Sequence, residues 1–169
     1  MQEWLDIVDL NDRVIGRDSR QQVHARRAVH RASHILLFNS QGQVFVQLRS
    51  QKKDEAAGLW DTSVAGHVDS GEDYLACAVR ELAEELGIAI DPSKLTWVDK
   101  LPPDESNGFE FTSLYYTCSD QPLILNPEEI DDGRWLLPAE LDTWIDREPS
   151  QFTGGFRVIW PIVRTFRFS

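Results

Sequence analysis

Hydrophobic residues follow two different periodicities along the chain. A continuous apolar run at 34–38 is typical of a buried strand, and residues 43–49 alternate between polar and apolar with period two. The turn-forming residues at 39–42 between these segments therefore predict a β-hairpin. Within 71–86, by contrast, apolar residues recur at every third or fourth position, which predicts a helix with one buried face.

The same patterns predict the order of the remaining elements. Extended segments are expected at 60–68, 95–98, 114–118 and 134–137, and helices at 139–145 and 156–166. Ser70 is the expected N-cap of the helix at 71–86, Gly87 is its expected terminator, and Pro138 stands where a later helix begins. Because strands and helices interleave with mixed spacing, the fold class is α/β with a mixed sheet.

Residues 1–29 are interpreted as an N-terminal extension, and residues 30–169 as the main domain. The turn signal at Asn11-Asp12 lies between two apolar pairs and predicts a short hairpin or an extended lead-in. The acidic first residues lack the basic and apolar segments of a signal peptide, and no apolar run is long enough to span a bilayer. A cytoplasmic protein is therefore expected.

Composition and net charge reduce the classes of molecule that this protein is expected to bind. The 169 residues include 17 Lys and Arg against 28 Asp and Glu, a net charge of −11, which disfavours a nucleic-acid polymer or an anionic membrane as partner. Cys77 and Cys118 are the only cysteines and have no disulfide or zinc-site spacing. The acidic residues are concentrated, because residues 69–85 hold six acids and one base and residues 126–146 hold seven acids and one base.

Three glutamates share one face of the helix predicted at 71–86. Glu81 is separated from Glu84 by three positions and from Glu85 by four, so the like charges repel one another by a few tenths of a kcal/mol per pair. A solvated acidic face is the simpler interpretation of these three residues alone. The alternative is a site for a hard divalent cation, which prefers carboxylate oxygens and offsets their repulsion.

A longer motif favours the cation site. Gly66, Glu72, Arg80-Glu81, Glu84-Glu85 and Gly87 occur in the spacing G-x5-E-x7-R-E-U-x-E-E-x-G-U, where U is a bulky aliphatic residue. A chance match at these constrained positions has a probability on the order of 10⁻⁷. The motif is the Nudix box, and the chain resembles the Nudix hydrolases across roughly residues 30 to 148.

The resemblance implies a mixed sheet between helices and hydrolysis of a phosphoanhydride bond in a nucleoside diphosphate derivative or a nucleoside triphosphate. It also implies Mg²⁺ or Mn²⁺ as cofactor, and a small phosphorylated molecule as partner. Since members of the family often dimerise, a homodimer stays open. The implied roles are metal binding by Glu84, Glu85 and the Ala65 carbonyl, metal binding or general-base catalysis by Glu81, orientation of a carboxylate by Arg80, and support by Gly66, Glu72 and Gly87.

Many relatives use a further acidic residue from a later loop, and the acidic segment at 126–135 resembles that region. Glu129 is the first candidate and Glu128 the second. An ordinary solvated acidic turn is an equally good interpretation of this segment.

Other residues resemble the Nudix branch that contains isopentenyl-diphosphate isomerase, among them 30–32, 47–49 and 58–67. In those isomerases, histidines near the positions of His24, His30 and His67 hold a metal, although here hydrogen-bonded structural histidines are the simpler interpretation. A cysteine that moves a proton in the isomerases is replaced by Ala65, which has no titratable group. An isomerase-like protein and a catalytically silent nucleotide-binding scaffold therefore remain alternatives to the hydrolase.

Basic residues before the box could bind substrate phosphates, because Arg and phosphate form paired hydrogen bonds. Arg31, Arg49 and His67 are the candidates for substrate binding, while most other basic residues there are interpreted as surface charge. Core packing rather than base stacking is expected of five tryptophans in apolar contexts: Trp60, Trp97, Trp135, Trp144 and Trp160.

Overall fold

A mixed seven-stranded β-sheet forms the centre of the protein in a computed structural model that describes residues 1–168. Its strands are β3 (His30–Phe38), β4 (Val44–Arg49), β5 (Trp60–Asp61), β6 (Val64–His67), β7 (Thr96–Leu101), β8 (Glu110–Cys118) and β9 (Ile130–Leu136). β3 pairs in parallel with β8 along its whole length and antiparallel with β6. β4 pairs antiparallel with β5 and β9, and β7 with β8.

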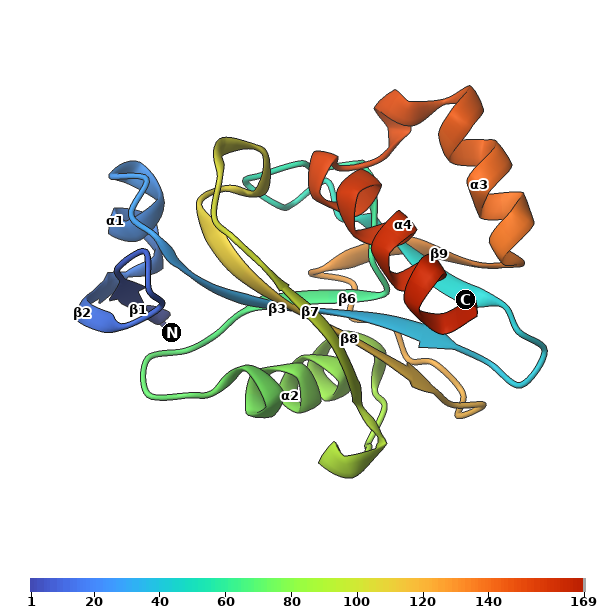
Figure 1. The fold of residues 1–169 in the computed structure, drawn as a ribbon, viewed down its shortest axis with the longest axis horizontal. Helices are drawn as coiled ribbons and strands as arrows, with labels where there is room; N and C mark the ends of the chain where they lie inside the picture. The colour runs from blue at the N-terminus through green and yellow to red at the C-terminus, as the bar shows by residue number, and fades with distance from the viewer. Residues whose placement is uncertain (169) are drawn as a thin grey trace.

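Helices cover both faces of this sheet (Figure 1). α2 (Tyr74–Leu86) packs on one face, where Ile35, Leu37 and Leu82 share a core cluster. α3 (Pro138–Arg147) and α4 (Gly154–Phe168) lie on the other face, where Leu36 and Phe38 pack in a second cluster. Because successive residues of β3 are buried on opposite sides, the strand reads as a continuous apolar run. The predicted α/β fold with a mixed sheet between helices is confirmed.

The turn at 39–42 joins β3 to β4 as predicted, but the hairpin is short. Phe38 and Val44 are the only residues that pair these two strands, since β4 then pairs with β9 while β3 continues along β6 and β8. The extended segment predicted at 60–68 divides into β5 and β6, because the chain changes its partner strand between them.

The helix expected from residue 71 begins three residues later, at Tyr74. Asp73 is its N-cap and accepts a hydrogen bond from the backbone N–H of Ala76. Gly71 has a φ of +84°, which no helix accommodates, and the Ser70 hydroxyl donates to Asp6 instead of capping. Gly87 ends the helix in the left-handed conformation, as predicted.

Residues 4–25 form a separate small unit beside the sheet. β1 (Trp4–Val8) and β2 (Val14–Ser19) make the predicted hairpin, and α1 (Arg20–Ala25) follows directly. Asp12, at the hairpin turn, accepts hydrogen bonds from Arg31 Nε at 2.7 Å, Tyr74 Oη at 2.8 Å and Lys100 Nζ at 2.8 Å. Burial opposes the ionisation of Asp12, but these three donors lower its pKa. The turn is thereby tied to three elements of the sheet domain, while a domain boundary near residue 30 stays a prediction.

Two further expectations need correction. Trp97 is 54% exposed, because it lies on β7 at the edge of the sheet, whereas Trp60 and Trp160 are buried as expected. α4 begins at Gly154 rather than at residue 156, with the Thr153 hydroxyl accepting from the Phe156 N–H. None of the helices within residues 1–168 is long and apolar enough to cross a membrane.

Candidate active site

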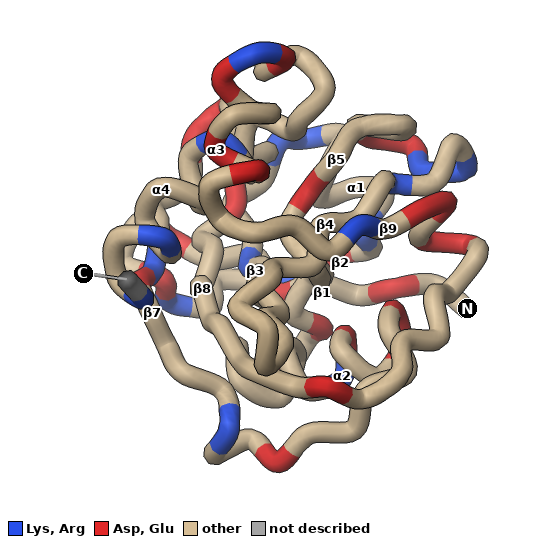
Figure 2. The backbone as a smooth tube through the Cα atoms, turned by 90° about the vertical axis from the view of Figure 1, so that its right-hand side faces the viewer, with Lys and Arg blue, Asp and Glu red and all other residues tan. Residues whose placement is uncertain are grey.

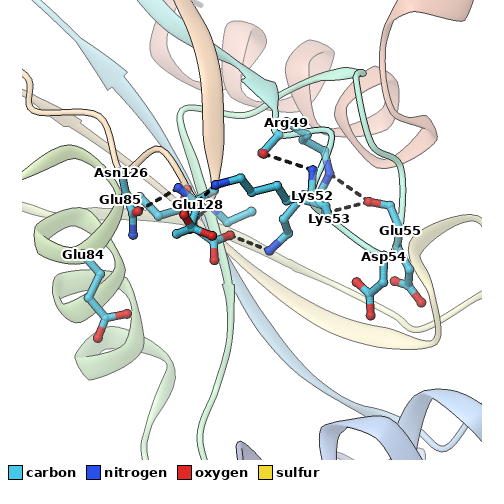
Figure 3. A network of polar contacts seen from close by, with 12 residues as sticks. Arg49, Lys52, Lys53, Asp54, Glu55, Glu84, Glu85, Asn126 and Glu128 are labelled. Atoms are coloured by element: carbon cyan, nitrogen blue, oxygen red, sulfur yellow. Dashed lines mark hydrogen bonds and ion pairs between the residues drawn. The ribbon is translucent and has the colours of Figure 1, made fainter. Parts of the chain in front are cut away.

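Glu81, Glu84 and Glu85 of the motif line a pocket of about 500 Å³, together with Ala65, Gly66 and His67 of β6. Glu85 is buried, and its carboxylate accepts hydrogen bonds from Gln47 Nε2 at 2.7 Å and the Ala65 N–H at 3.4 Å. Glu81 lies one turn earlier on α2 and also lines the pocket, while Glu84 is mostly exposed at its rim. Figure 3 shows Glu84 and Glu85 projecting from α2.

Arg80 holds three carboxylates of the motif in place. Its guanidinium donates to both oxygens of Glu72, at 2.8 and 2.9 Å, to Glu81 Oε1 at 2.7 Å and to Glu84 Oε2 at 3.2 Å. The same side chain donates to the carbonyl of His67 at 3.0 Å, which fixes α2 against β6. Glu81 is therefore oriented by a paired arginine rather than by solvent.

Gly66 permits the close approach of α2 to β6. A Cβ atom at this position would lie 2.1 Å from the carboxyl carbon of Glu81, so any side chain would displace the glutamate. The carboxyl group of Glu81 therefore occupies the space that a side chain at position 66 would fill.

The clustered carboxylates resist ionisation. Burial raises the pKa of Glu81 to about 7, although Arg80 opposes the shift, and nearby Glu84 and Glu129 add to it. Burial and the charge of Glu81 also raise the pKa of Glu85 well above its usual value. A divalent cation would reverse this preference, because it favours the ionised form of each ligand. The oxygen-rich donor set fits a hard ion such as Mg²⁺.

The structure brings Glu129 to the pocket and leaves Glu128 outside it. Glu129 lines the pocket and accepts from Lys53 Nζ at 2.5 Å, and its negative charge contributes to the raised pKa of both Glu81 and Glu85. Glu128 is exposed and pairs with Lys52 (Figure 3). The loop between β4 and β5 contains Lys52, Lys53, Asp54 and Glu55, whereas the loop between β8 and β9 contains acidic but no basic residues. β9 itself carries both acidic and basic positions (Figure 2).

Only some of the expected substrate contacts face this pocket. Arg49 and His67 line it, with Arg49 held by Asp61 and the Glu55 carbonyl. Arg31 does not line it, because it follows His30 on β3 and so points to the opposite face, where it binds Asp12. The expectation that Arg31 contacts substrate does not fit this placement.

A second group of polar residues lies at the other end of the pocket, where α1, β3, β6 and β8 meet. It comprises His24, His30, His67 and Glu110, whose nearest ligand atoms all lie within 4.8 Å of one another. The Nε2 atoms of His24 and His67 are 3.3 Å apart, and Glu110 Oε1 lies 3.1 Å from His67 Nε2 and 3.4 Å from His30 Nε2. A tetrahedral ion with bonds of about 2.0–2.1 Å would separate neighbouring ligands by about 3.4 Å.

The protonation of His30 supports metal binding by this group. Its Nδ1 lies 2.8 Å from the Ala28 carbonyl, which can only accept, so Nδ1 carries a proton. Its Nε2 is buried and lies 3.4 Å from Glu110 Oε1 without a hydrogen-bond partner. Burial opposes the ionisation of Glu110, but His30 and His67 lower its pKa, so the carboxylate is charged and a cation between it and the rings would satisfy both.

The sequence did not indicate Glu110. The strand was predicted to begin at residue 114, four residues after its true beginning. Neither the pattern of alternating faces nor the pairing with a neighbouring strand could therefore be applied to Glu110. The register of the parallel strands β3 and β8 places Glu110 beside the histidines, because Glu110 lies directly opposite His30.

Comparisons with known proteins agree with this geometry. The model of the NUDIX domain matches residues 28–153. A Nudix hydrolase of Yersinia pestis is 39% identical over 152 residues, which cover 85% of this chain and 78% of the relative. An isopentenyl-diphosphate Delta-isomerase of Serratia proteamaculans is 36% identical over 162 residues, which cover 94% of this chain and 90% of the relative.

A solved structure shares the fold at a similar level of identity. The crystal structure of DR0079 from Deinococcus radiodurans has a TM-score of 0.74 and 35% identity, with coverage of 86% of this chain and 90% of that one. The chain therefore belongs to the Nudix family, as the motif predicted. It is an enzyme of the pyrophosphohydrolase class, and divalent metals are the general cofactors of that class.

Proposed function

We propose that this enzyme hydrolyses a phosphoanhydride bond in a nucleoside diphosphate derivative or a nucleoside triphosphate, with Mg²⁺ or Mn²⁺ as cofactor. The observation that carries the proposal is one pocket with Glu81, Glu84, Glu85 and Glu129 on one side and the basic residues Arg49 and Lys53 beside them. Carboxylates that bind a cation and cations that bind phosphate oxygens are the two requirements of metal-assisted phosphoanhydride cleavage.

Each of the pocket residues has a separate role in the proposed reaction. Glu84 and Glu85 would hold the ion, together with the Ala65 carbonyl, and a bound ion would neutralise charge on the phosphate oxygens and make water more acidic. Glu81 would accept the proton of the attacking water, for which a pKa of about 7 is well matched to neutral pH. Arg80 keeps Glu81 oriented, and Glu129, now paired with Lys53, is a further carboxylate within the pocket.

Isomerisation is not proposed for this chain despite the isomerase relative. Double-bond migration needs a group that donates or accepts a proton at carbon, and Ala65 offers none. Cys77 does not replace the missing thiol, since it is buried on α2, where it contacts the carbonyls of Gly66 and His67, and burial raises its pKa.

A nucleotide panel tests the proposed hydrolysis. We expect the protein to cleave at least one substrate with Mg²⁺ or Mn²⁺, either a nucleoside diphosphate derivative into a nucleoside monophosphate and a phosphorylated second product, or a nucleoside triphosphate with release of phosphate or pyrophosphate. This activity should be lost when the metal is removed by chelation. Product formation is followed by anion-exchange chromatography. Tight nucleotide binding without turnover under every metal condition would instead support the silent scaffold.

We also propose that His24, His30, His67 and Glu110 bind a separate transition-metal ion. The nitrogen-rich donor set favours an ion such as Zn²⁺ or Mn²⁺ over Mg²⁺. The Nδ1 atoms of His24 and His30 make further contacts that orient these two imidazole rings. His24 Nδ1 lies 3.3 Å from Glu55, and His30 Nδ1 donates to the Ala28 carbonyl. The ion would join α1 of the N-terminal unit to three strands of the sheet.

Metal titration of the chelated protein tests this second site. Zn²⁺ should bind the wild type, and His24→Ala should weaken that binding by about tenfold to a hundredfold or more, because a ligand is lost. Glu84→Gln is the matched control and should leave this binding event unchanged while weakening Mg²⁺ binding. Equal Zn²⁺ affinity of His24→Ala and the wild type would contradict the site.

A further inference from the structure

Two lysine–glutamate pairs join the loop between β4 and β5 to the loop between β8 and β9. Lys52 Nζ donates to Glu128 Oε1 at 2.6 Å (Figure 3), and Lys53 Nζ donates to Glu129 Oε2 at 2.5 Å. The surroundings of the two pairs differ, because Lys52 and Glu128 are exposed outside the pocket, whereas Lys53 and Glu129 line it. The second pair therefore lies inside the candidate active site.

The backbone that carries Glu129 is fixed from two sides. The Asn126 N–H donates to the Glu85 carbonyl at 2.9 Å, which ties the turn to the end of α2. On the other side, the Ser50 N–H donates to the carbonyl of Glu129, also at 2.9 Å. Since this backbone is held at both sides, Glu129 can change its partner by rotating its side chain alone.

The Glu129 side chain has two possible partners within the pocket. One is Lys53, with which it pairs now, and the other is a cation held by Glu81 and Glu85, which line the same pocket. The side chains of Lys53 and Glu129 are 22% and 36% exposed, and an ion pair so accessible to water contributes little to stability. An exchange of partners therefore costs little.

A substrate phosphate is the group that could cause such an exchange. The Lys53 ammonium has three hydrogens to donate, and a phosphate offers several anionic oxygens where Glu129 offers one carboxylate. Lys53 lines the pocket, so its ammonium is accessible to a bound substrate.

We propose that Lys53 holds Glu129 away from the cation site until a substrate phosphate binds Lys53 and releases the Glu129 carboxylate toward the α2 glutamates. The inference rests on the proposed hydrolysis and adds an order of events to it. The full set of carboxylates is then assembled only in the complex with substrate, so that substrate binding itself completes the site.

Removal of the Lys53 charge tests the hold on Glu129 in the protein without substrate. Lys53→Met should increase the affinity for Mg²⁺ by about fivefold or more, because the released carboxylate becomes available as a ligand. Lys53→Arg keeps the pair and should bind Mg²⁺ within about twofold of the wild type. Calorimetric titration measures the affinity, and Mg²⁺ is the probe because the nitrogen-rich histidine group favours other ions.

Lys52→Met is the matched control. It makes the same chemical change at the neighbouring pair, whose partner Glu128 lies outside the pocket. Its Mg²⁺ affinity should stay within about twofold of the wild type, because an exposed charge is screened by solvent. Thermal melting of each variant monitors the fold.

Glu129→Gln distinguishes a released ligand from the loss of a repelling charge. In the wild-type background it should change Mg²⁺ affinity by less than about threefold, because Lys53 occupies the carboxylate, whereas in Lys53→Met it should lower the affinity by about fivefold or more. Equal effects in the two backgrounds would mean that Lys53 acts through its charge alone and would overturn the proposal.

Methylenediphosphonate tests the release by phosphate. It carries two phosphoryl groups joined through carbon, so the protein cannot hydrolyse it. In its presence Glu129→Gln should lower Mg²⁺ affinity relative to the wild type by about fivefold or more, although the same substitution has little effect without it. The same small effect with and without methylenediphosphonate would overturn the release.

Failure of the exchange and failure of the proposed function give different results. Nucleotide hydrolysis by a wild type whose Lys53 and Glu129 substitutions act additively on Mg²⁺ affinity would overturn the exchange and leave the hydrolase activity standing. The expected Mg²⁺ affinities in a protein that hydrolyses no nucleotide would overturn the proposed function instead.

Discussion

Glu85→Gln is expected to lower kcat by at least about a thousandfold, which corresponds to about 4 kcal/mol of lost transition-state stabilisation. The substitution removes one of the charges that would hold the ion, while the shape of the side chain is kept. Because Glu85 is buried and favours its neutral form, a neutral amide in its place should not unfold the protein. Steady-state assays at saturating metal, together with thermal melting, measure both effects.

Glu128→Gln is the matched control for this substitution. The same chemical change is made on an exposed side chain that pairs with Lys52 and does not line the pocket. It should therefore leave kcat within about twofold of the wild type, as surface substitutions usually leave a protein little changed. Retention of more than a tenth of the activity by Glu85→Gln would contradict the metal role.

The raised pKa values of Glu81 and Glu85 predict that metal binding depends on pH. Since the pKa of Glu81 is raised to about 7 and that of Glu85 well above its usual value, both carboxyls hold protons that an ion must displace. Mg²⁺ should consequently bind more weakly as the pH falls from 8 to 6, and binding should release protons into the buffer. Calorimetry in buffers of different ionisation enthalpy measures that release.

The glutamate wall could be predicted from the sequence because it is local. Glu81, Glu84 and Glu85 lie within five residues of one helix, so the helical period alone places them on one face. Gly66 and Glu72 are close along the chain as well, and the motif spacing includes them. No knowledge of strand order was needed for this part of the site.

The opposite end of the pocket could not be predicted, because it depends on long-range register. Glu110 reaches the histidines only through the parallel pairing of β3 with β8, 80 residues apart in sequence for His30 and Glu110. His34 was assigned to a buried strand, yet its ring contacts the hydroxyl of Thr62, which belongs to another segment. Alternation along a strand places residues on faces but does not say which strand lies beside it.

Arg31 is a residue that the sequence placed in the site and the structure places outside it. As an arginine just before a predicted strand it was a reasonable phosphate contact, but β3 begins at His30 and not at residue 34. Once the strand includes His30, period two sends His30 and Ala32 toward the pocket and Arg31 away from it. Its partner Asp12 lies in the N-terminal hairpin, whose contact with the sheet no local pattern specifies.

Gly66→Ala is expected to lower kcat by about a hundredfold while changing the stability of the fold little. The added Cβ would meet the side chain of Glu81, whose carboxyl carbon lies 2.1 Å from that position. A flexible side chain can move aside at small cost, but it then leaves the hydrogen bond from Arg80 and the place from which it acts on water. KM should change less than kcat, because Arg49 and Lys53 are not displaced.

A double-mutant cycle shows whether the loss acts through Glu81. If it does, Gly66→Ala combined with Glu81→Ala should be no less active than Glu81→Ala alone, because the displaced group is already absent. Gly16→Ala is the matched control, since a Cβ there meets no atom within 4 Å, and it should keep wild-type activity. Additive losses in the double variant, or a full loss of folding in Gly66→Ala, would mean that the glycine serves the strand itself and not the position of the glutamate.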